Sequence, residues 1–212
     1  MIKGIEFDEK NITKLFYDVA SIEIGDNVEF SFEKAEQIRE DHEYGGIRIS
    51  AIANYFSLKL AIKFDFSTGD IVTPEPITYS YKPLLDDVTI VIKTYNPETI
   101  LAEKIQTILW RGTATTRMRD YYDVWLFAKI YKESINTELF YKALINTARN
   151  RDSLNVLDDW TEKLNRFVVD ENLIDQWERF KNKKEYTEDI DFADVFSEIK
   201  KLMKYFDKYK GT

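Results

Sequence analysis

The chain has 212 residues, of which 44% are hydrophobic, and this is enough to form a buried core without covalent cross-links. It contains no cysteine and one histidine, which excludes disulfides, thiolate zinc sites, cysteine nucleophiles and multi-histidine metal sites. The formal net charge of −8 argues against a protein that coats nucleic acid, although a local basic patch could still bind RNA or DNA.

The N-terminus has no apolar run typical of a signal peptide, and no stretch of apolar residues is long enough to span a membrane. We therefore expect a cytoplasmic protein without a membrane partner.

The first half of the chain alternates apolar with polar residues after a short amphipathic helix expected at residues 11–20. This alternation predicts β-strands, the clearest of which is 58–66. The Tyr44-Gly45-Gly46 run predicts a turn, and two prolines in 73–76 predict an extended loop. The expected strands cover residues 28–32, 47–52, 58–66 and 88–93.

The second half of the chain shows apolar residues at helical spacing. Asn96, Pro97 and Glu98 are typical of a helix start, because they supply a cap, a fitting first residue and a favourable charge. We predict an α+β fold, a mixed or antiparallel sheet followed by a helical bundle, with domains at 1–95 and 96–212. The expected helices cover residues 97–110, 117–131, 137–149, 153–167, 171–183 and a last helix with an apolar stripe from Phe192 to Phe206.

Two charged residues of the strand at 58–66 are candidates for a metal site. Lys63 and Asp65 share one face of that strand, opposite its apolar residues. A carboxylate on a rigid strand could bind a hard cation such as Mg²⁺. The alternative is a solvent-facing ion pair on the polar face of the sheet.

Lys104 lies on or beside the apolar stripe of the helix that begins at Pro97. A partly buried lysine needs a charged partner or a ligand, and a nucleotide phosphate is one such ligand. The alternative is a lysine whose aliphatic stem covers apolar surface while its amine reaches water.

Asp120 and Asp123 are three residues apart and face the same way on the following helix. Two carboxylates at the head of an apolar stripe are costly unless they are paired or metal-bound. They also lie near a helix N-terminus, where negative charge is favourable without any further function.

A basic segment connects these two helices. Residues 104–119 contain four basic residues, including Arg117 and Arg119, and no acidic residue. Together with Gly112 and nearby threonine hydroxyls, this segment suits phosphate binding, but it also fits an ordinary exposed connection. No phosphate-binding GxxxxGK[ST] or GxGxxG motif is present. The single histidine, His42, is expected to be a solvated loop residue.

Several strings in order resemble the AbiEii/AbiGii family of nucleotidyltransferase toxins, from abortive-infection toxin–antitoxin systems that act in phage defence. The similarity covers about residues 40–127 and extends weakly to the N-terminus. It is carried by Tyr44-Gly45-Gly46-Ile47-Arg48, Ile62-Lys63-Phe64-Asp65-Phe66-Ser67-Thr68-Gly69-Asp70, Tyr95-Asn96-Pro97-Glu98-Thr99-Ile100-Leu101-Ala102-Glu103-Lys104, Arg111-Gly112 and Arg117-Met118-Arg119-Asp120-Tyr121-Tyr122-Asp123.

The resemblance implies a fold like the DNA-polymerase-β-type nucleotidyltransferases, with a helical C-terminal part. It implies transfer of a nucleotidyl group from NTP, with Mg²⁺, onto tRNA or a protein, and a cognate antitoxin as partner. By position, Asp65 matches the metal-binding carboxylate, Lys104 the phosphate-contacting lysine, and Asp120 and Asp123 the final acidic motif. Lys63, Arg117 and Arg119 match as supporting basic groups.

One family motif is absent from the sequence. Family members begin with a Gly-Ser-rich turn and an Asp-x-Asp pair, whereas the one Asp-x-Asp here, at 189–191, lies near the last helix. We therefore expect a truncated chain with impaired activity, since paired carboxylates position the metal ions in phosphoryl transfer. The alternatives are an inactive homologue that binds an antitoxin or another partner, and an unrelated α+β binding domain. The sequence leaves the oligomeric state open.

Overall fold

The computed structural model describes residues 5–38, 45–84 and 87–210. The chain divides into two compact units, Met1–Asp70 and Ile71–Thr212. Each unit has its own hydrophobic core. The mixed α+β class and the helical C-terminal part are confirmed.

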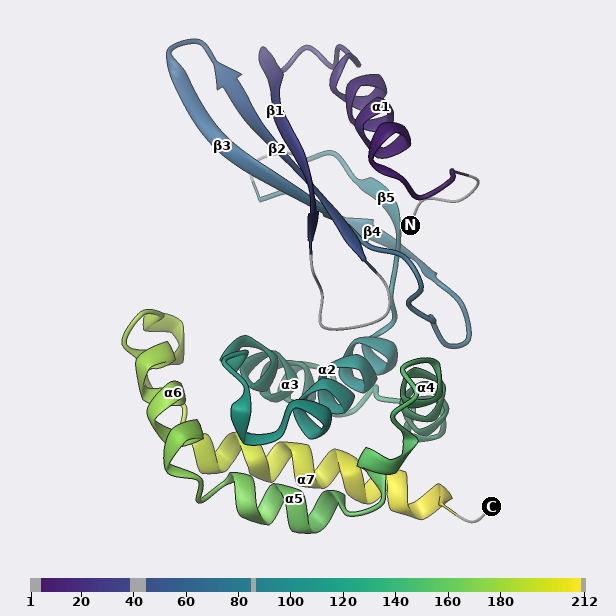
Figure 1. Ribbon diagram of the computed structural model, residues 1–212, viewed down its shortest axis with the longest axis vertical. Helices are drawn as coiled ribbons and strands as arrows, with labels where there is room; N and C mark the ends of the chain where they lie inside the picture. Colours follow the sequence, from purple (N-terminus) through teal and green to yellow (C-terminus); the bar gives the residue numbers. More distant parts are fainter. Residues whose placement is uncertain (1–4, 39–44, 85–86, 211–212) are drawn as a thin grey trace. The chain divides into compact units, whose positions relative to one another are not determined.

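The first unit packs helix α1 (Glu9–Ala20) against an antiparallel sheet of β1 (Val28–Ile38), β2 (Gly46–Tyr55) and β3 (Leu58–Phe66), as Figure 1 shows. Alternate residues of β2 and β3 face α1, so apolar side chains form one face and polar side chains the other. The buried residues of this core are Ile12, Phe16, Ile47, Ile49 and Ala51.

Two elements of the first unit differ in length from the expectation. Helix α1 begins earlier because Asp8 caps it, its carboxylate accepting from the Asn11 amide at 2.7 Å. Strand β1 runs beyond residue 32 because a bulge between Phe32 and Lys34 lets pairing with β2 resume as far as Ile38.

The second unit begins with a hairpin of β4 (Ile77–Tyr81) and β5 (Ile90–Thr94), and then contains only helices. Strand β4 was not predicted. The hairpin belongs to the same compact unit as the helices, so the boundary between the units along the chain falls at residues 70 and 71. The functional domain boundary expected at residues 95 and 96 stays a prediction. The helical elements are α2 (Pro97–Arg111), η1 (Gly112–Ala114), α3 (Met118–Ile130), α4 (Thr137–Asn150), η2 (Leu154–Leu157), α5 (Trp160–Phe167), α6 (Glu171–Lys181), η3 (Glu185–Thr187) and α7 (Phe192–Tyr209).

Helix α7 runs along α3 and α4, and α2 packs against α3 and α4 (Figure 1). The apolar stripe predicted for α7 forms much of the core of this unit. The helix expected at 153–167 is instead the short turn η2 followed by α5. At this interruption η2 contacts α2 and α4, and its residues Val156 and Leu157 are buried.

Within the described residues, no helix combines the length and apolar character needed to cross a bilayer.

Candidate functional site

Lys104 of α2 contacts the two predicted site carboxylates of α3, Asp120 and Asp123. Its Nζ lies 3.0 Å from Asp120 Oδ1 and 2.8 Å from Asp123 Oδ2. The side chain of Lys104 is 22% exposed and that of Asp120 only 6%. The lysine is therefore a partner of two carboxylates, and the alternative of an amine that reaches into water does not describe it.

Two arginines complete the pairing of these carboxylates. Arg117 Nε lies 2.7 Å from Asp120 Oδ2, and Arg119 Nε lies 2.9 Å from Asp123 Oδ1. We call Lys104, Arg117, Arg119, Asp120 and Asp123 the ion cluster. With three cations and two carboxylates, it carries a net positive charge in an acidic chain.

Local sequence explains why the two helices present these groups side by side. Asn96 caps α2, its carboxamide oxygen accepting from the Thr99 amide at 2.7 Å. Gly112 ends α2 at φ 57° and ψ −142°, a conformation essentially restricted to glycine. The hydroxyl of Thr115 then accepts from the Arg117 amide at 3.0 Å, immediately before α3 begins. This turn brings the first turn of α3 against the middle of α2.

Asp120 combines the two roles considered from sequence, whereas Asp123 lies beyond the first turn and has only the pairing. Asp120 lies in the first turn of α3, where the helix dipole favours its charge, but no side chain caps this helix. Its carboxylate instead accepts from Lys104 and Arg117. Position near the helix end and pairing in the ion cluster therefore act together.

The ion cluster has the chemistry of an anion site. The side chains of Arg117 and Arg119 are 56% and 65% exposed, and each contacts its carboxylate through Nε. A guanidinium carries further N–H donors in a planar fork that fits phosphate oxygens. Since the aspartates already orient the cations, a phosphate would meet prepositioned donors.

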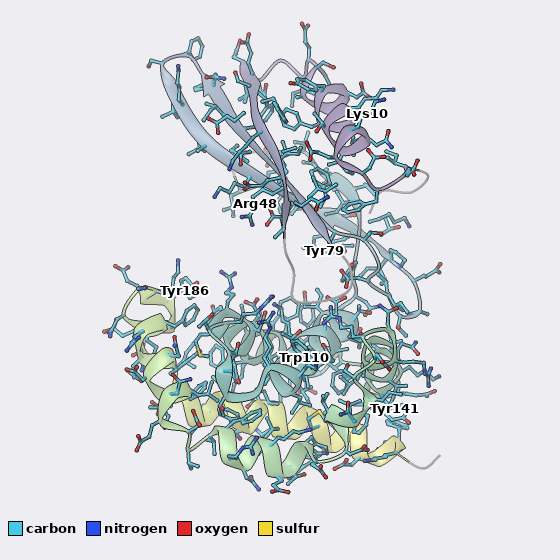
Figure 2. All side chains as sticks on the ribbon, in the orientation of Figure 1. Lys10, Arg48, Tyr79, Trp110, Tyr141 and Tyr186 are labelled. Atoms are coloured by element: carbon cyan, nitrogen blue, oxygen red, sulfur yellow. The ribbon has the colours of Figure 1, made fainter. Side chains whose placement is uncertain are left out.

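Asp65 lies in the first unit, on the polar face of the sheet, where Arg48 of β2 stands opposite it (Arg48 is labelled in Figure 2). Arg48 Nε and Nη2 donate to Asp65 Oδ1 and Oδ2 at 2.6 and 2.7 Å. This bidentate bond is the main reason that the pKa of Asp65 is lowered, and the charge of Lys63 contributes less. The ion-pair alternative therefore describes Asp65 in this unit.

The described carboxylates do not by themselves form a Mg²⁺ site. No three of the described histidine, aspartate or glutamate side chains gather as metal ligands would. Arg48 engages both oxygens of Asp65, while Asp120 and Asp123 are paired with cations. Asp65 as a metal ligand stays a prediction.

The structure thus brings together Lys104, Arg117, Arg119, Asp120 and Asp123. Asp65 and Lys63 belong to the other unit, which is described by itself. His42 and Tyr44 lie outside the described residues.

Arg48 is the residue that sequence reasoning missed as the partner of Asp65. A usable signal was present, because counting back along both strands from the tight turn at residues 56–57 pairs position 48 with position 65. Opposite charges on one face of such a pair predict a cross-strand ion pair.

Comparison with solved structures gives distant matches. A candidate nucleotidyltransferase from H. pylori is 15% identical over 92% of this chain and 73% of its own, with a TM-score of 0.38. JHP933 from Helicobacter pylori is also 15% identical, over 85% of this chain and 66% of its own, with a TM-score of 0.37. Neither likeness is high enough to carry an argument. No curated protein matches the chain.

The family model described as nucleotidyl transferase AbiEii toxin, type IV toxin–antitoxin system, matches residues 2–198. This match excludes the alternative of an unrelated α+β domain. Because it covers nearly the whole chain, the protein belongs to the AbiEii family of nucleotidyl transferase toxins.

Proposed function

We propose that the ion cluster binds the phosphates of a nucleoside triphosphate and that the chain transfers a nucleotidyl group to tRNA or to a protein. The observation that carries this proposal is the contact of one partly buried lysine with two carboxylates, flanked by two half-exposed arginines. What favours a ligand over a purely structural network is that the cluster holds a net positive charge with two arginines more than half exposed at the surface.

In the proposed reaction, the cationic side chains of the ion cluster would contact the phosphates of the nucleoside triphosphate. In nucleotidyl transfer, an acceptor oxygen forms a bond to the α-phosphorus, and the bond from that phosphorus to the pyrophosphate oxygen breaks. The acceptor hydroxyl loses its proton to a base or to water, and pyrophosphate leaves with the electron pair. Lys104, Arg117 and Arg119 would offset the negative charge on that leaving group.

Asp120 and Asp123 would act as positioning residues for these cations. Each accepts from Lys104 and from one arginine, so the donors are already oriented before a nucleotide arrives. Nucleotidyltransferases of this family generally use a divalent metal, and we expect Mg²⁺ to supply charge neutralisation at the phosphates when bound. Asp65, which belongs to the other unit and is paired with Arg48 there, stays a proposed metal ligand on its match to the family pattern alone.

Membership of a toxin–antitoxin family implies a cognate antitoxin as partner. A second function, an inactive homologue that binds its antitoxin or another partner, is favoured by the pairing of Asp65. Arg48 engages both oxygens of this carboxylate, which therefore already has a partner in its own unit.

Calorimetric binding of ATP and of inorganic tripolyphosphate tests the ion cluster. We expect Lys104→Gln to weaken both ligands at least tenfold, because it removes the cation shared by both carboxylates. Lys142→Gln is the matched control, since Lys142 is an exposed lysine of the same unit that pairs with Glu138. Arg119→Gln, at a more exposed position, serves if Lys104→Gln lowers the melting temperature. Unchanged affinity in both folded variants would refute phosphate binding here.

Transfer of label from NTP that is radioactive at the α-phosphate separates the two functions, because that phosphate stays with the nucleotidyl group while pyrophosphate leaves. Incorporation into tRNA or protein by the wild-type chain, lost in Lys104→Gln and retained in Lys142→Gln, is the result expected of a transferase. Nucleotide binding without incorporation, in the presence of Mg²⁺, would favour the inactive homologue.

A further inference from the structure

Aromatic side chains gather on α3 and at the turn after α6. The ring of Tyr122 lies 5.0 Å from that of Tyr186, between centroids, and 6.2 Å from that of Trp125, with which it is stacked at 28°. Phe180 of α6 lies 6.4 Å from the same ring. We call Tyr122, Trp125 and Tyr186 the aromatic surface.

The members of the aromatic surface differ in exposure. Tyr122 is buried, Trp125 is partly buried, and Tyr186 is 51% exposed. Tyr186 is labelled in Figure 2. The ring of Tyr186 is tilted by 52° against the buried ring of Tyr122, so one part of it is held by packing while about half of the side chain stays exposed. That combination suits stacking by a planar ligand at little entropic cost.

The aromatic surface adjoins the ion cluster. Tyr122 directly precedes Asp123 on α3, and Arg119 lies one helical turn before both. The pKa of Arg119 is raised mainly by its hydrogen bond to Asp123, and Tyr186 and Tyr122 are near enough to contribute a smaller effect. Arg119 therefore contacts the ion cluster through Asp123 and lies near the aromatic surface.

We propose that Tyr186, supported by Tyr122, stacks against the nucleobase of a nucleotide whose phosphates contact Arg119 and Lys104. This inference rests on the phosphate-binding role proposed above and adds the site for the base. Base–aromatic stacking accepts any base, because every base has a π-face, so the site selects nucleotides over inorganic phosphates without selecting one base.

Exposed charges of both signs lie beside Tyr186 in the chain. Lys183 and Lys184 precede it, and Glu185 and Glu188 lie on either side of it. Because these charges largely offset one another, the choice of a mononucleotide follows from the triphosphate proposed for the ion cluster. The orientation that follows is phosphates on Arg119 and base on Tyr186.

Packing alone is the competing explanation. The contact between Tyr186 and Tyr122 also holds the turn after α6 against α3, which requires no ligand. The two explanations differ in what they predict for ligands with and without a base.

The experiment compares ATP, CTP, inorganic tripolyphosphate and a short unstructured RNA oligomer as calorimetric ligands of the full chain. Its variants are Tyr186→Leu, Tyr186→Phe and the matched control Tyr205→Leu, an exposed tyrosine of α7 in the same unit. We expect Tyr186→Leu to weaken both nucleotides by on the order of tenfold and to leave tripolyphosphate unchanged. Tyr186→Phe retains the ring and should bind like the wild type, as should Tyr205→Leu.

Failure of this inference is distinguishable from failure of phosphate binding. If Tyr186→Leu binds nucleotides normally while Lys104→Gln loses nucleotides and tripolyphosphate, stacking is refuted and the phosphate site stands. If the wild type binds RNA, and not mononucleotides, in a manner dependent on Tyr186, the inference of a mononucleotide base is overturned. Equal loss of tripolyphosphate in Tyr186→Leu overturns the inference, since a ring that only holds the turn would then explain the effect.

Discussion

Two adjacent residues of α3 show how differently buried polar groups are satisfied in this protein. The carboxylate of Asp120, nearly buried, accepts from Lys104 and Arg117. The next side chain, Tyr121, is fully buried, and its hydroxyl has no hydrogen-bond partner among the described residues. Burial raises the pKa of Tyr121, so this hydroxyl stays protonated. The polar side of α3 is therefore fixed by charge pairing, and its core side by ring packing against Phe192 and Phe196.

Arg48→Met should raise the pKa of Asp65 towards its ordinary value, because the bidentate hydrogen bond is the main cause of the depression. A carboxyl whose pKa is lowered on folding stabilises the folded state above its unfolded pKa, and this stabilisation is lost as the pH falls through the folded pKa. The stability advantage of the wild type over Arg48→Met should therefore be full at neutral pH and shrink in the acidic range. Carboxyl NMR titration and urea unfolding measure the two effects.

Lys63→Met is the control for this prediction, since Lys63 acts on Asp65 through charge alone and less strongly. It should shift the titration of Asp65 less than Arg48→Met does. A titration of Asp65 identical in the wild type and Arg48→Met would contradict the assignment.

The sequence predicted the members of the ion cluster better than their contacts. Helical spacing placed Asp120 and Asp123 on one face, because three residues nearly complete a turn. The pairing of both with Lys104 depends on how α2 and α3 pack, which spacing within one helix does not determine. The family resemblance identified these three residues as site candidates, and the packing of α2 against α3 shows that they contact one another.

At the scale of elements, the start of α2 is tied to a distant loop. The Asn96 side chain caps the helix and also donates to the Thr73 carbonyl at 2.6 Å. The Thr99 hydroxyl donates to the same carbonyl and accepts from the Thr73 amide, both at 3.2 Å. From α4, Asn146 donates to the Thr73 hydroxyl at 3.1 Å. These bonds hold the loop before β4 against two helices.

Asn96→Ala should therefore cost more stability than loss of an ordinary helix cap. We expect about 2–3 kcal/mol, because the substitution removes the cap and leaves the Thr73 carbonyl with one fewer donor at a buried position. Asn136→Ala is the matched control. Asn136 caps α4 with a bond of 3.0 Å at a more exposed site, so about 1 kcal/mol is expected. Chemical denaturation measures both, and equal losses would show that the contact with Thr73 adds nothing.

Sequence signals located most of the longer helices and missed several short elements, two of them, η2 and β4, for identifiable reasons. Caps and apolar stripes defined α2, α3, α4, α6 and α7 to within a few residues, because both signals are local. The turn η2 interrupts an apolar pattern that is itself helical, and only its packing reveals the break. Strand β4 follows two prolines and has no buried face, so no burial pattern marks it.

At the scale of the whole molecule, buried apolar surface is distributed unevenly. The helical part of the second unit contains most of the buried hydrophobic residues, whereas the core of the first unit is small. Both strands of the hairpin β4–β5 are exposed along almost their whole length. Local stability should follow this distribution, since opening a segment with few buried contacts costs little free energy.

Hydrogen exchange followed by mass spectrometry tests this expectation on the intact chain. Amides of β4 and β5 should exchange much faster than those of α2 and α7, because a two-stranded hairpin without a buried face is only marginally stable. Amides of β2, which is paired on both sides, should be protected more than those of the hairpin. Protection of the hairpin equal to that of α2 would mean that its exposed face is covered in solution.

The sharing of Lys104 by Asp120 and Asp123 has a consequence for how this protein can diverge. Neutral replacement of the lysine leaves two acids with only half-exposed arginines as counter-ions, and replacement of either acid adds excess positive charge. Each single step therefore weakens the cluster, whereas loss of the lysine together with one of the two acids leaves its net charge unchanged. Position 104 should therefore change together with position 120 or 123, so that a homologue lacking the lysine also lacks one of the acids.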